Sequence, residues 1–401
     1  MTLATNAKDT VYIGCMTGTS ADAVADFTAA TFSPDGHPQK LMHHAVTIPT
    51  ALQTSLRLLS SKGGRIKSAQ HSQVTLELSR FLAAAFLQVI EHWGLSKLAK
   101  HRIILSPHGQ TICHQPQQGI TEQLLDAALI ANKTGHAVVH QHRVACLKVS
   151  NAAPLAPVLL QQLFTNRRHN TIILNGGGIA NITVLPQDRE APLVGYDTGP
   201  ANGPLDSLID HFVTERPHQL PTHMKNAQYD PNGELAASGK LIQPLYDQLL
   251  NDPYFGLPLH QKSADRQDFD LDWIGDHHLY NHSAADLCHT VAVVVATSIE
   301  DAIKKHVSEQ DSLFYCYGGI AHNRFIMQRI EQGLLHTSCQ VESLQQIGLH
   351  GDFIESLLMA YLGFCVTNNK RVDLHYCSKT QDARCIPGSL LLPKTNTMQS
   401  A

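Results

Sequence analysis

Two short apolar strands in this sequence each lead into a glycine-containing turn, the first also rich in hydroxyl groups, and an aspartate follows each turn in the chain. The first is Val11–Met16 before the turn 17–22, and the second is 171–174 before the turn 175–178, with Asp197 further on. Glycines let backbone N–H groups crowd a phosphate, hydroxyls add donors, and an aspartate can hold Mg²⁺ or accept a proton. One such turn is common, but two that open similar patterns of elements predict an ATP-using phosphotransferase with the nucleotide between two related halves.

The turn Thr17-Gly18-Thr19-Ser20 is the best candidate for gripping the ATP phosphates. An ordinary hairpin turn carries similar residues, so the motif alone leaves both interpretations open. A glycine pair, Gly318-Gly319, ends a buried-type strand just before a helix that starts near Asn323. Because the backbone N–H groups at a helix N-terminus attract anions, this pair predicts a second nucleotide-binding corner.

Asp197 is the candidate general base, because it follows a short apolar strand that should deliver its carboxylate to a strand end. Negative phosphates near a carboxylate help it to accept a proton near neutral pH. The alternative is an N-cap for the helix near 203, a role that Asn202 fills better. Asp22 is the candidate for holding Mg²⁺ through water, and a hairpin aspartate bonded to its own backbone is the alternative.

Three further residues are candidates for contacting a sugar. His108 and Gln110 follow a short buried-type strand, although a loop histidine is often merely exposed. Glu355 lies on the last helix among apolar residues, where a carboxylate needs a partner such as a hydroxyl-rich ligand or a lysine.

Composition narrows the class of protein. The chain has 401 residues, of which 43% are hydrophobic and 16% charged, enough for about two domains with sizeable cores. The net charge of −4 gives no basic surface for nucleic acid, and no apolar run reaches the length of a membrane span. The nine cysteines are scattered, and the 25 histidines show no zinc spacing. With an N-terminus unlike a signal peptide, these features favour a cytoplasmic protein with reduced thiols and no metal cluster.

The hydrophobic pattern predicts the order β-β-β-α-β-α-β, followed by a variant of it. In the first half we expect strands at 11–16, 24–32, 41–48, 102–105 and 137–139, with helices around 74–89 and 122–134. In the second half we expect strands at 171–174, 179–185, 193–196 and 313–317, helices from 203, 284–305, from 323 and 352–364, and irregular insertions at 217–275. This order predicts two α/β domains with mixed sheets rather than a doubly wound fold.

The ordered set of motifs resembles that of the 1,6-anhydro-N-acetylmuramic acid kinases, in the sugar kinase, Hsp70 and actin superfamily. The resemblance runs from about residue 11 to 366 and rests on Met16–Asp22, His108–Thr111, Gly177–Thr183, Asp197–Asn202, Gly318-Gly319 with His322-Asn323, and Glu355. It implies two related actin- or hexokinase-like domains with RNase H-like repeats and a central nucleotide cleft. The expected division is 1–145 and 146–375, with a tail at 376–401 and a final helix, 352–366, that could pack back on the first domain.

The resemblance also implies a reaction. Such an enzyme opens the 1,6-anhydro ring with water and moves the γ-phosphate of ATP onto O6, giving N-acetylmuramic acid 6-phosphate in peptidoglycan recycling. Asp197 would deprotonate the water that attacks C1, and Mg²⁺ would stabilise the transferring charge. The implied nucleotide-binding residues are Gly18, Thr19, Ser20, Ala21, Asp22, Ala23, Val24, Ala25, Gly318 and Gly319. The implied partners are a small amino sugar and a second copy of the chain, with neither nucleic acid nor membrane.

Three segments depart from the family pattern. The family's D-G-x-D is here Asp22-Ala23-Val24-Ala25, and Asp26, one place late on a strand, points to the other face. The family's G-G-Q-G-A-P is here 149–154, Val-Ser-Asn-Ala-Ala-Pro, and K-S-T-G-R-E is 262–267, Lys-Ser-Ala-Asp-Arg-Gln. These changes predict a slower enzyme. They also leave open a kinase of the same fold for another sugar, or a regulatory paralogue that binds nucleotide or sugar.

Overall fold

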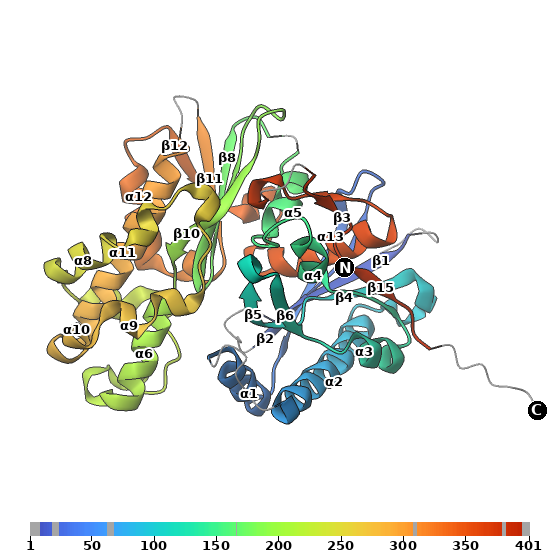
Figure 1. Ribbon diagram of the computed structural model, residues 1–401, viewed down its shortest axis with the longest axis horizontal. Helices are drawn as coiled ribbons and strands as arrows, with labels where there is room; N and C mark the ends of the chain where they lie inside the picture. The colour runs from blue at the N-terminus through green and yellow to red at the C-terminus, as the bar shows by residue number, and fades with distance from the viewer. Residues whose placement is uncertain are drawn as a thin grey trace, which may run out of the picture. The chain divides into compact units, whose positions relative to one another are not determined.

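The computed structural model describes residues 9–17, 24–61, 68–165, 167–307, 311–378 and 382–394. The chain divides into two compact units. Unit 1 comprises Met1–Leu163 with Asp352–Ala401, and unit 2 comprises Phe164–Gly351 (Figure 1). The first boundary therefore lies at 163 rather than 145, and residues from 352 onward, including the expected tail, belong to unit 1.

Unit 1 is built on a mixed sheet with the strand order β15-β7-β4-β1-β2-β3. Its strands are β1 Val11–Met16, β2 Val24–Phe32, β3 Pro38–Thr47, β4 Ile103–Pro107, β7 Ala137–His140 and β15 Ser389–Leu391. β1 pairs antiparallel with β2 and parallel with β4. The remaining elements are the hairpin β5 Gln110–Gln115 with β6 Ile120–Leu124, the pair β13 Val372–Asp373 with β14 Arg384–Cys385, and α1 Thr50–Ser61, α2 Ser68–His92, α3 Ala127–Thr134, α4 His142–Leu147, α5 Ala156–Leu163 and α13 Ile354–Thr367.

Unit 2 repeats this arrangement with the strand order β10-β9-β8-β11-β12. Its strands are β8 Asn170–Gly176, β9 Ile179–Leu185, β10 Val194–Pro200, β11 Ser312–Tyr317 and β12 Cys339–Glu342. Its helices are α6 Gly203–Glu215, α7 Glu234–Ser238, α8 Gln243–Leu250, α9 Leu271–Ile274, α10 Asp276–Asn281, α11 Ala284–Lys304 and α12 Arg324–Leu334. In both units three antiparallel strands are followed by parallel strands added beside the first. The expectation of two related α/β domains with mixed sheets is therefore confirmed.

Alternation along β1 supplies both faces of the unit 1 sheet. Ile13 is fully buried in the cluster that contains Phe27 and Phe86 of α2, whose rings meet edge-on with centroids 5.0 Å apart. On the other face, α13 lies directly on Gly14, where a Cβ would be 1.9 Å from the carbonyl oxygen of Ser356. Only glycine allows this approach of helix to strand.

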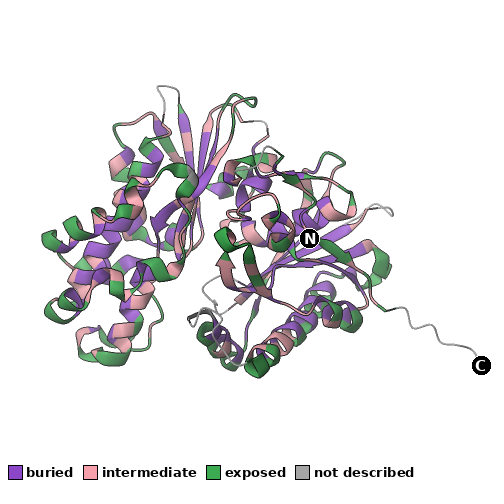
Figure 2. Cartoon of the chain, in the orientation of Figure 1, coloured by how far each residue is buried: buried purple, intermediate pink, exposed green. Residues whose placement is uncertain are grey.

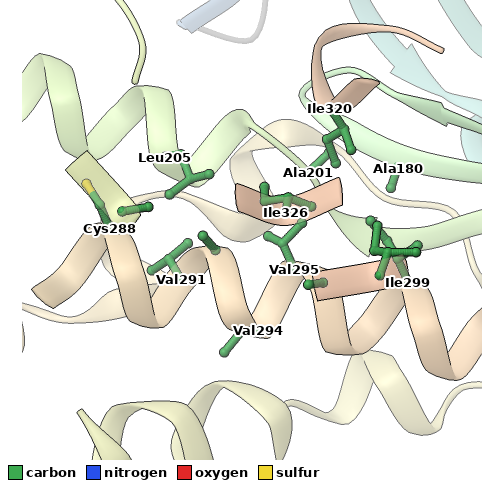
Figure 3. Packing of buried hydrophobic residues seen from close by; sticks show 14 of the residues in the cluster. Ala180, Ala201, Leu205, Cys288, Val291, Val294, Val295, Ile299, Ile320 and Ile326 are labelled. Atoms are coloured by element: carbon green, nitrogen blue, oxygen red, sulfur yellow. The ribbon is translucent and has the colours of Figure 1, made fainter. Parts of the chain in front are cut away.

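α11 forms the centre of unit 2. Its buried Val291 and Val295 belong to a cluster that also contains Ala201, Ile320 and Ile326 (Figures 2 and 3). Ala201 follows β10, and Ile320 follows β11. The turns at the ends of these two strands are thus fixed by the apolar core beneath them.

Two predicted segments differ from the structure. The helix expected near 122–134 begins only at Ala127, because 120–124 form the β6 strand of a hairpin. Residues 217–275 are not irregular insertions: they form short helices, including α7, α8 and α9, that bury Leu235, Leu245 and Ile274.

α2 is long and apolar enough to span a membrane by length and composition alone, although polar and charged residues interrupt its apolar stretch. Half of its most apolar window is buried. Its Leu78, Leu82 and Phe86 lie in the core of unit 1, as in the core helix of a globular protein.

Candidate functional site

Asp197 lies in β10, where the register against β9 shifts between Asp197 and Gly199. Such a bulge re-aims a side chain and is common next to active sites. The backbone N–H of Ala264 donates to Asp197 Oδ2 (3.0 Å), and the Tyr254 hydroxyl donates to the Asp197 carbonyl oxygen (2.8 Å). Asp197 is partly exposed. The carboxylate is therefore fixed through one oxygen by a backbone donor.

The glycine turns of unit 2 contact the segment that follows Asp197. The N–H groups of Ala201 and Gly203 donate to the Gly178 carbonyl at 3.1 and 3.0 Å, which joins the β10–α6 turn to the β8–β9 turn. A Cβ at Gly319 would lie 2.5 Å from Asn202 Nδ2, and one at Gly318 would lie 2.9 Å from the carbonyl oxygen of Gly176. The Gly318-Gly319 turn thus packs on Asn202, five residues after Asp197, and on Gly176 at the end of β8.

Asn202 does not cap α6 with its side chain, which corrects that part of the sequence interpretation. It occupies the N-cap position with φ −75° and ψ −15°, already helical, and makes no capping side-chain hydrogen bond. Its amide lies against Gly319 instead. The side chain of Asn323 does cap α12, accepting from the N–H of Ile326 at 3.2 Å.

His108 is buried, not exposed. Its Nε2 accepts from Arg143 Nε at 2.9 Å, and its Nδ1 lies 2.8 Å from the Gly109 carbonyl oxygen, so both ring nitrogens have protein partners. Burial, followed by the nearby Arg143 guanidinium, holds the pKa of His108 well below its usual range. The ring is thus a neutral imidazole with the proton on Nδ1, and Arg143 joins His108 to the Ala152 carbonyl (2.8 Å).

Gln110 is also buried, at the start of β5. The hydroxyl of Thr17 donates to Gln110 Oε1 at 3.1 Å and lies 3.3 Å from the Gly109 carbonyl oxygen. Thr17, the one described residue of the predicted phosphate turn Thr17-Gly18-Thr19-Ser20, therefore contacts the predicted sugar-binding loop. Gly18, Thr19, Ser20, Ala21, Asp22 and Ala23 lie outside the described residues, and with them the predicted Mg²⁺ site.

Val24 and Ala25 begin β2. Ala25 is fully buried in the unit 1 core, whereas Asp26 is partly exposed and pairs with Met16 across the strands. The two neighbours thus differ in burial, as expected for opposite faces of a strand. An aspartate at position 25 would place a carboxylate among apolar side chains and would need a partner of its own.

Glu355 lies in the first turn of α13 and is partly buried. The neighbouring Ser356 is fully buried and bonds Thr28 of β2 through their hydroxyls at 2.6 Å. α13 is thus anchored to the sheet of unit 1 at the turn that carries Glu355.

Sequence reasoning missed three contributors. Ala264 acts through its backbone, and only its place in a recognisable motif, 262–267, pointed to it. Arg143 and Tyr254 lie in segments without a motif, and no sequence signal singled them out. All nine cysteines are free thiols, and no cluster of three or more metal-ligating side chains occurs among the described residues.

A family model described as anhydro-N-acetylmuramic acid kinase matches residues 10–389. The protein of that name from Sulfurovum sp. (strain NBC37-1) is 34% identical over 370 residues, covering 90% of this chain and 94% of that protein. The one from Idiomarina loihiensis is 30% identical over 364 residues, covering 90% and 93%. A solved ROK family glucokinase from Streptomyces griseus, in complex with glucose and AMPPNP, is 12% identical with a TM-score of 0.35, covering 88% and 98%, and is too distant to support an argument.

The match therefore runs through both units, from the residue before β1 to the start of β15, and the relatives align along almost all of their own length. The chain belongs to the anhydro-N-acetylmuramic acid kinase family of sugar kinases.

Proposed function

We propose that this protein uses ATP and water to convert 1,6-anhydro-N-acetylmuramic acid into N-acetylmuramic acid 6-phosphate, a step in peptidoglycan recycling. The single observation that supports this most is the setting of Asp197. It lies at a strand bulge with one carboxylate oxygen held by the Ala264 N–H, and Asn202, five residues later, lies against Gly319. A general base needs such a fixed orientation.

In this proposal Asp197 takes the proton of the water that attacks C1. The C1–O6 bond breaks, and O6 attacks the γ-phosphorus of ATP, so ADP leaves. Gly318 and Gly319 carry no side chain beside their backbone, which suits the approach of phosphate oxygens to N–H groups. Mg²⁺, held by Asp22 through water, would offset the phosphate charge.

We further propose that the remaining phosphate contacts come from residues 18–24, because Ala25 is buried in the unit 1 core, and the sugar contacts from Gln110 and Glu355. His108 takes a different role from the one expected. Because both of its ring nitrogens are occupied within unit 1, it would shape the loop that carries Gln110 rather than bind the sugar through its ring. The protein would act in the cytoplasm as a homodimer.

A second candidate is a kinase for a different amino sugar, which the departures favour. Ala25 is packed in the apolar core of unit 1. The position where the family has its second aspartate is therefore built here for an apolar side chain.

A coupled assay of ADP release separates the two candidates. The purified protein is tested against 1,6-anhydro-N-acetylmuramic acid, 1,6-anhydro-N-acetylglucosamine and the two corresponding reducing sugars. The proposal predicts a clear preference for the first sugar. A preference for a reducing sugar would replace it with the second candidate, and no sugar-stimulated ADP release would contradict both.

A further inference from the structure

A pair of aromatic rings packs on the backbone of β10 two residues after Asp197. Tyr254 and Phe255 lie in the 3-10 turn Pro253–Gly256, and their rings pack on Gly199, where a Cβ would be 2.9 Å from Phe255 Cε1 and 3.7 Å from Tyr254 Cε1. Gly199 has φ +141°. The aromatic pair thus packs on a bare stretch of the bulge that re-aims Asp197.

The aromatic turn is anchored on its far side. Asp252 caps it, accepting from the Tyr254 N–H at 2.8 Å, and also accepts from Trp273 Nε1 at 3.0 Å. The Tyr254 ring meets Phe269 edge-on with centroids 5.2 Å apart. The contacts of Asp252 and Phe269 therefore fix the turn that carries the Tyr254 hydroxyl.

Lys262 connects this turn to the segment that holds the carboxylate. Its Nζ donates to the Tyr254 carbonyl at 3.1 Å and lies 4.6 Å from the Tyr254 ring centroid and 5.8 Å from that of Phe255. Its side chain is buried, with 7% exposed, and burial lowers its pKa to about 8, with the nearby Lys305 acting in the same direction. Its carbonyl faces the Asp197 N–H at 3.4 Å.

We infer that Tyr254 is a positioning residue for Asp197 and that Lys262 holds Tyr254 in place. The Tyr254 hydroxyl fixes the Asp197 carbonyl, while Ala264, two residues after Lys262, fixes the carboxylate. Lys262 connects these two contacts. Its ammonium group binds the aromatic turn that carries Tyr254, and its backbone continues to Ala264, whose N–H binds the Asp197 carboxylate. The inference rests on the proposed role of Asp197 as base.

The contacts of the Lys262 ammonium group explain why a lysine is tolerated at this buried position. An ammonium with a carbonyl and two ring faces as partners is partly compensated for lost water. Burial also raises the pKa of Tyr254, followed by the nearby Asp197 charge, so its hydroxyl stays protonated and can donate at every working pH.

The variant Tyr254→Phe removes only the hydroxyl and keeps the ring. We expect kcat to fall about 3- to 10-fold, as for the loss of one hydrogen bond, with KM for ATP unchanged. Tyr280→Phe is the matched control, because Tyr280 is a 60% exposed tyrosine of the same unit. Lys262→Met should lower kcat less, and should cost nothing further when added to Tyr254→Phe, because both act through one contact.

A second readout does not depend on turnover. In protein labelled with ¹³C at the aspartate carboxyl carbon, the Asp197 signal is identified by its loss in Asp197→Asn. The inference predicts that this signal shifts or broadens in Tyr254→Phe and stays in place in Tyr280→Phe. An unmoved signal together with kcat within twofold of the unmodified protein would overturn it.

The two readouts separate the possible failures. If the unmodified protein turns over no anhydrosugar, the proposed function fails, and the carboxyl signal alone decides whether Tyr254 positions Asp197. If the sugar is turned over and Tyr254→Phe is silent in both measurements, the positioning role fails while the proposed function stands.

Discussion

The two units share a strand order but treat their chemistry-bearing loops differently. In unit 1 the His108 ring, in the loop after β4, is buried, and Arg143 and the Gly109 carbonyl bind its two nitrogens within the unit. In unit 2 the bulge of β10 leaves Asp197 partly exposed, with one carboxylate oxygen held by a backbone donor. The same strand order thus holds a neutral, fully bonded imidazole in one unit and a partly exposed carboxylate in the other.

The largest expected effect tests this contrast directly. Asp197→Asn should lower turnover about 10²- to 10⁴-fold with little change in ATP binding, because the amide cannot act as a base. His108→Gln should cost far less turnover and mainly lower stability, because the ring is bound within unit 1. Steady-state assays and calorimetric ATP titrations of both variants check this. Equal losses of turnover would break the comparison.

The glycine corner of unit 2 should show the next largest effect. Gly318→Ala places a Cβ 2.8 Å from Asn175 Oδ1 at a residue with φ +80°, so the turn must shift. We expect ATP affinity to fall about tenfold or more, in line with a loss of one or two backbone donors. Gly348→Ala is the control, because its φ is +77° but nothing lies within 4 Å of the added carbon. If both variants bind ATP alike, the corner does not contact the nucleotide.

Acid should weaken unit 1 through its buried histidines. Burial lowers the pKa of His142 to about 4, so between pH 6.5 and 4 the unfolded state binds more protons than the folded state. The unfolding free energy should then fall by about 2 kcal/mol from this residue by pH 5. His142→Gln should flatten that slope.

The two tryptophans allow each unit to be followed separately. Trp93 lies in unit 1 and Trp273 in unit 2, and they are the only two in the chain. Urea unfolding monitored by fluorescence in Trp273→Phe and Trp93→Phe backgrounds therefore reports each unit. If the unfolding free energy falls more steeply with acid in unit 2 than in unit 1, the buried histidines of unit 1 are not the main source of acid sensitivity.

The smallest expected effect concerns a departure from the family pattern in unit 1. Ala152 has φ +56°, a left-handed conformation that costs an L-residue about 1–2 kcal/mol, at a position where the family has glycine. Part of this cost returns as entropy of the unfolded chain, so Ala152→Gly should stabilise unit 1 by about 0.5–1 kcal/mol. Urea unfolding followed through Trp93 measures it. A destabilised variant would show that the Ala152 side chain itself is needed.

Local sequence signals predicted the regular parts of the fold well. β1, β2 and β9 have the expected bounds, and Gly94, which follows the long helix α2, has φ +68°. An apolar run that forms a strand and a glycine that ends a helix each depend on only a few neighbouring residues. The hairpin β5–β6 and the short helices of 217–275 were missed, because their stability comes from packing against distant elements.

The candidate site was predictable only where a motif marked it. Asp197 and the glycine pair stand in recognisable motifs, and Asn202 of the Asp197 motif lies against Gly319. The burial of His108 was not predictable, because it depends on Arg143, which is far away in sequence. The role of Tyr254 could not be predicted for the same reason, because it depends on a hydrogen bond to a carbonyl 57 positions away in sequence.

The mass of the product tests the central claim most directly. The unmodified protein is incubated with ATP and 1,6-anhydro-N-acetylmuramic acid, and the sugar product is analysed by mass spectrometry and ³¹P NMR. The account predicts a sugar 6-phosphate heavier than the substrate by the elements of both metaphosphate and water, formed one for one with ADP and lost in Asp197→Asn. A product heavier by metaphosphate alone, with its anhydro ring intact, would contradict the account.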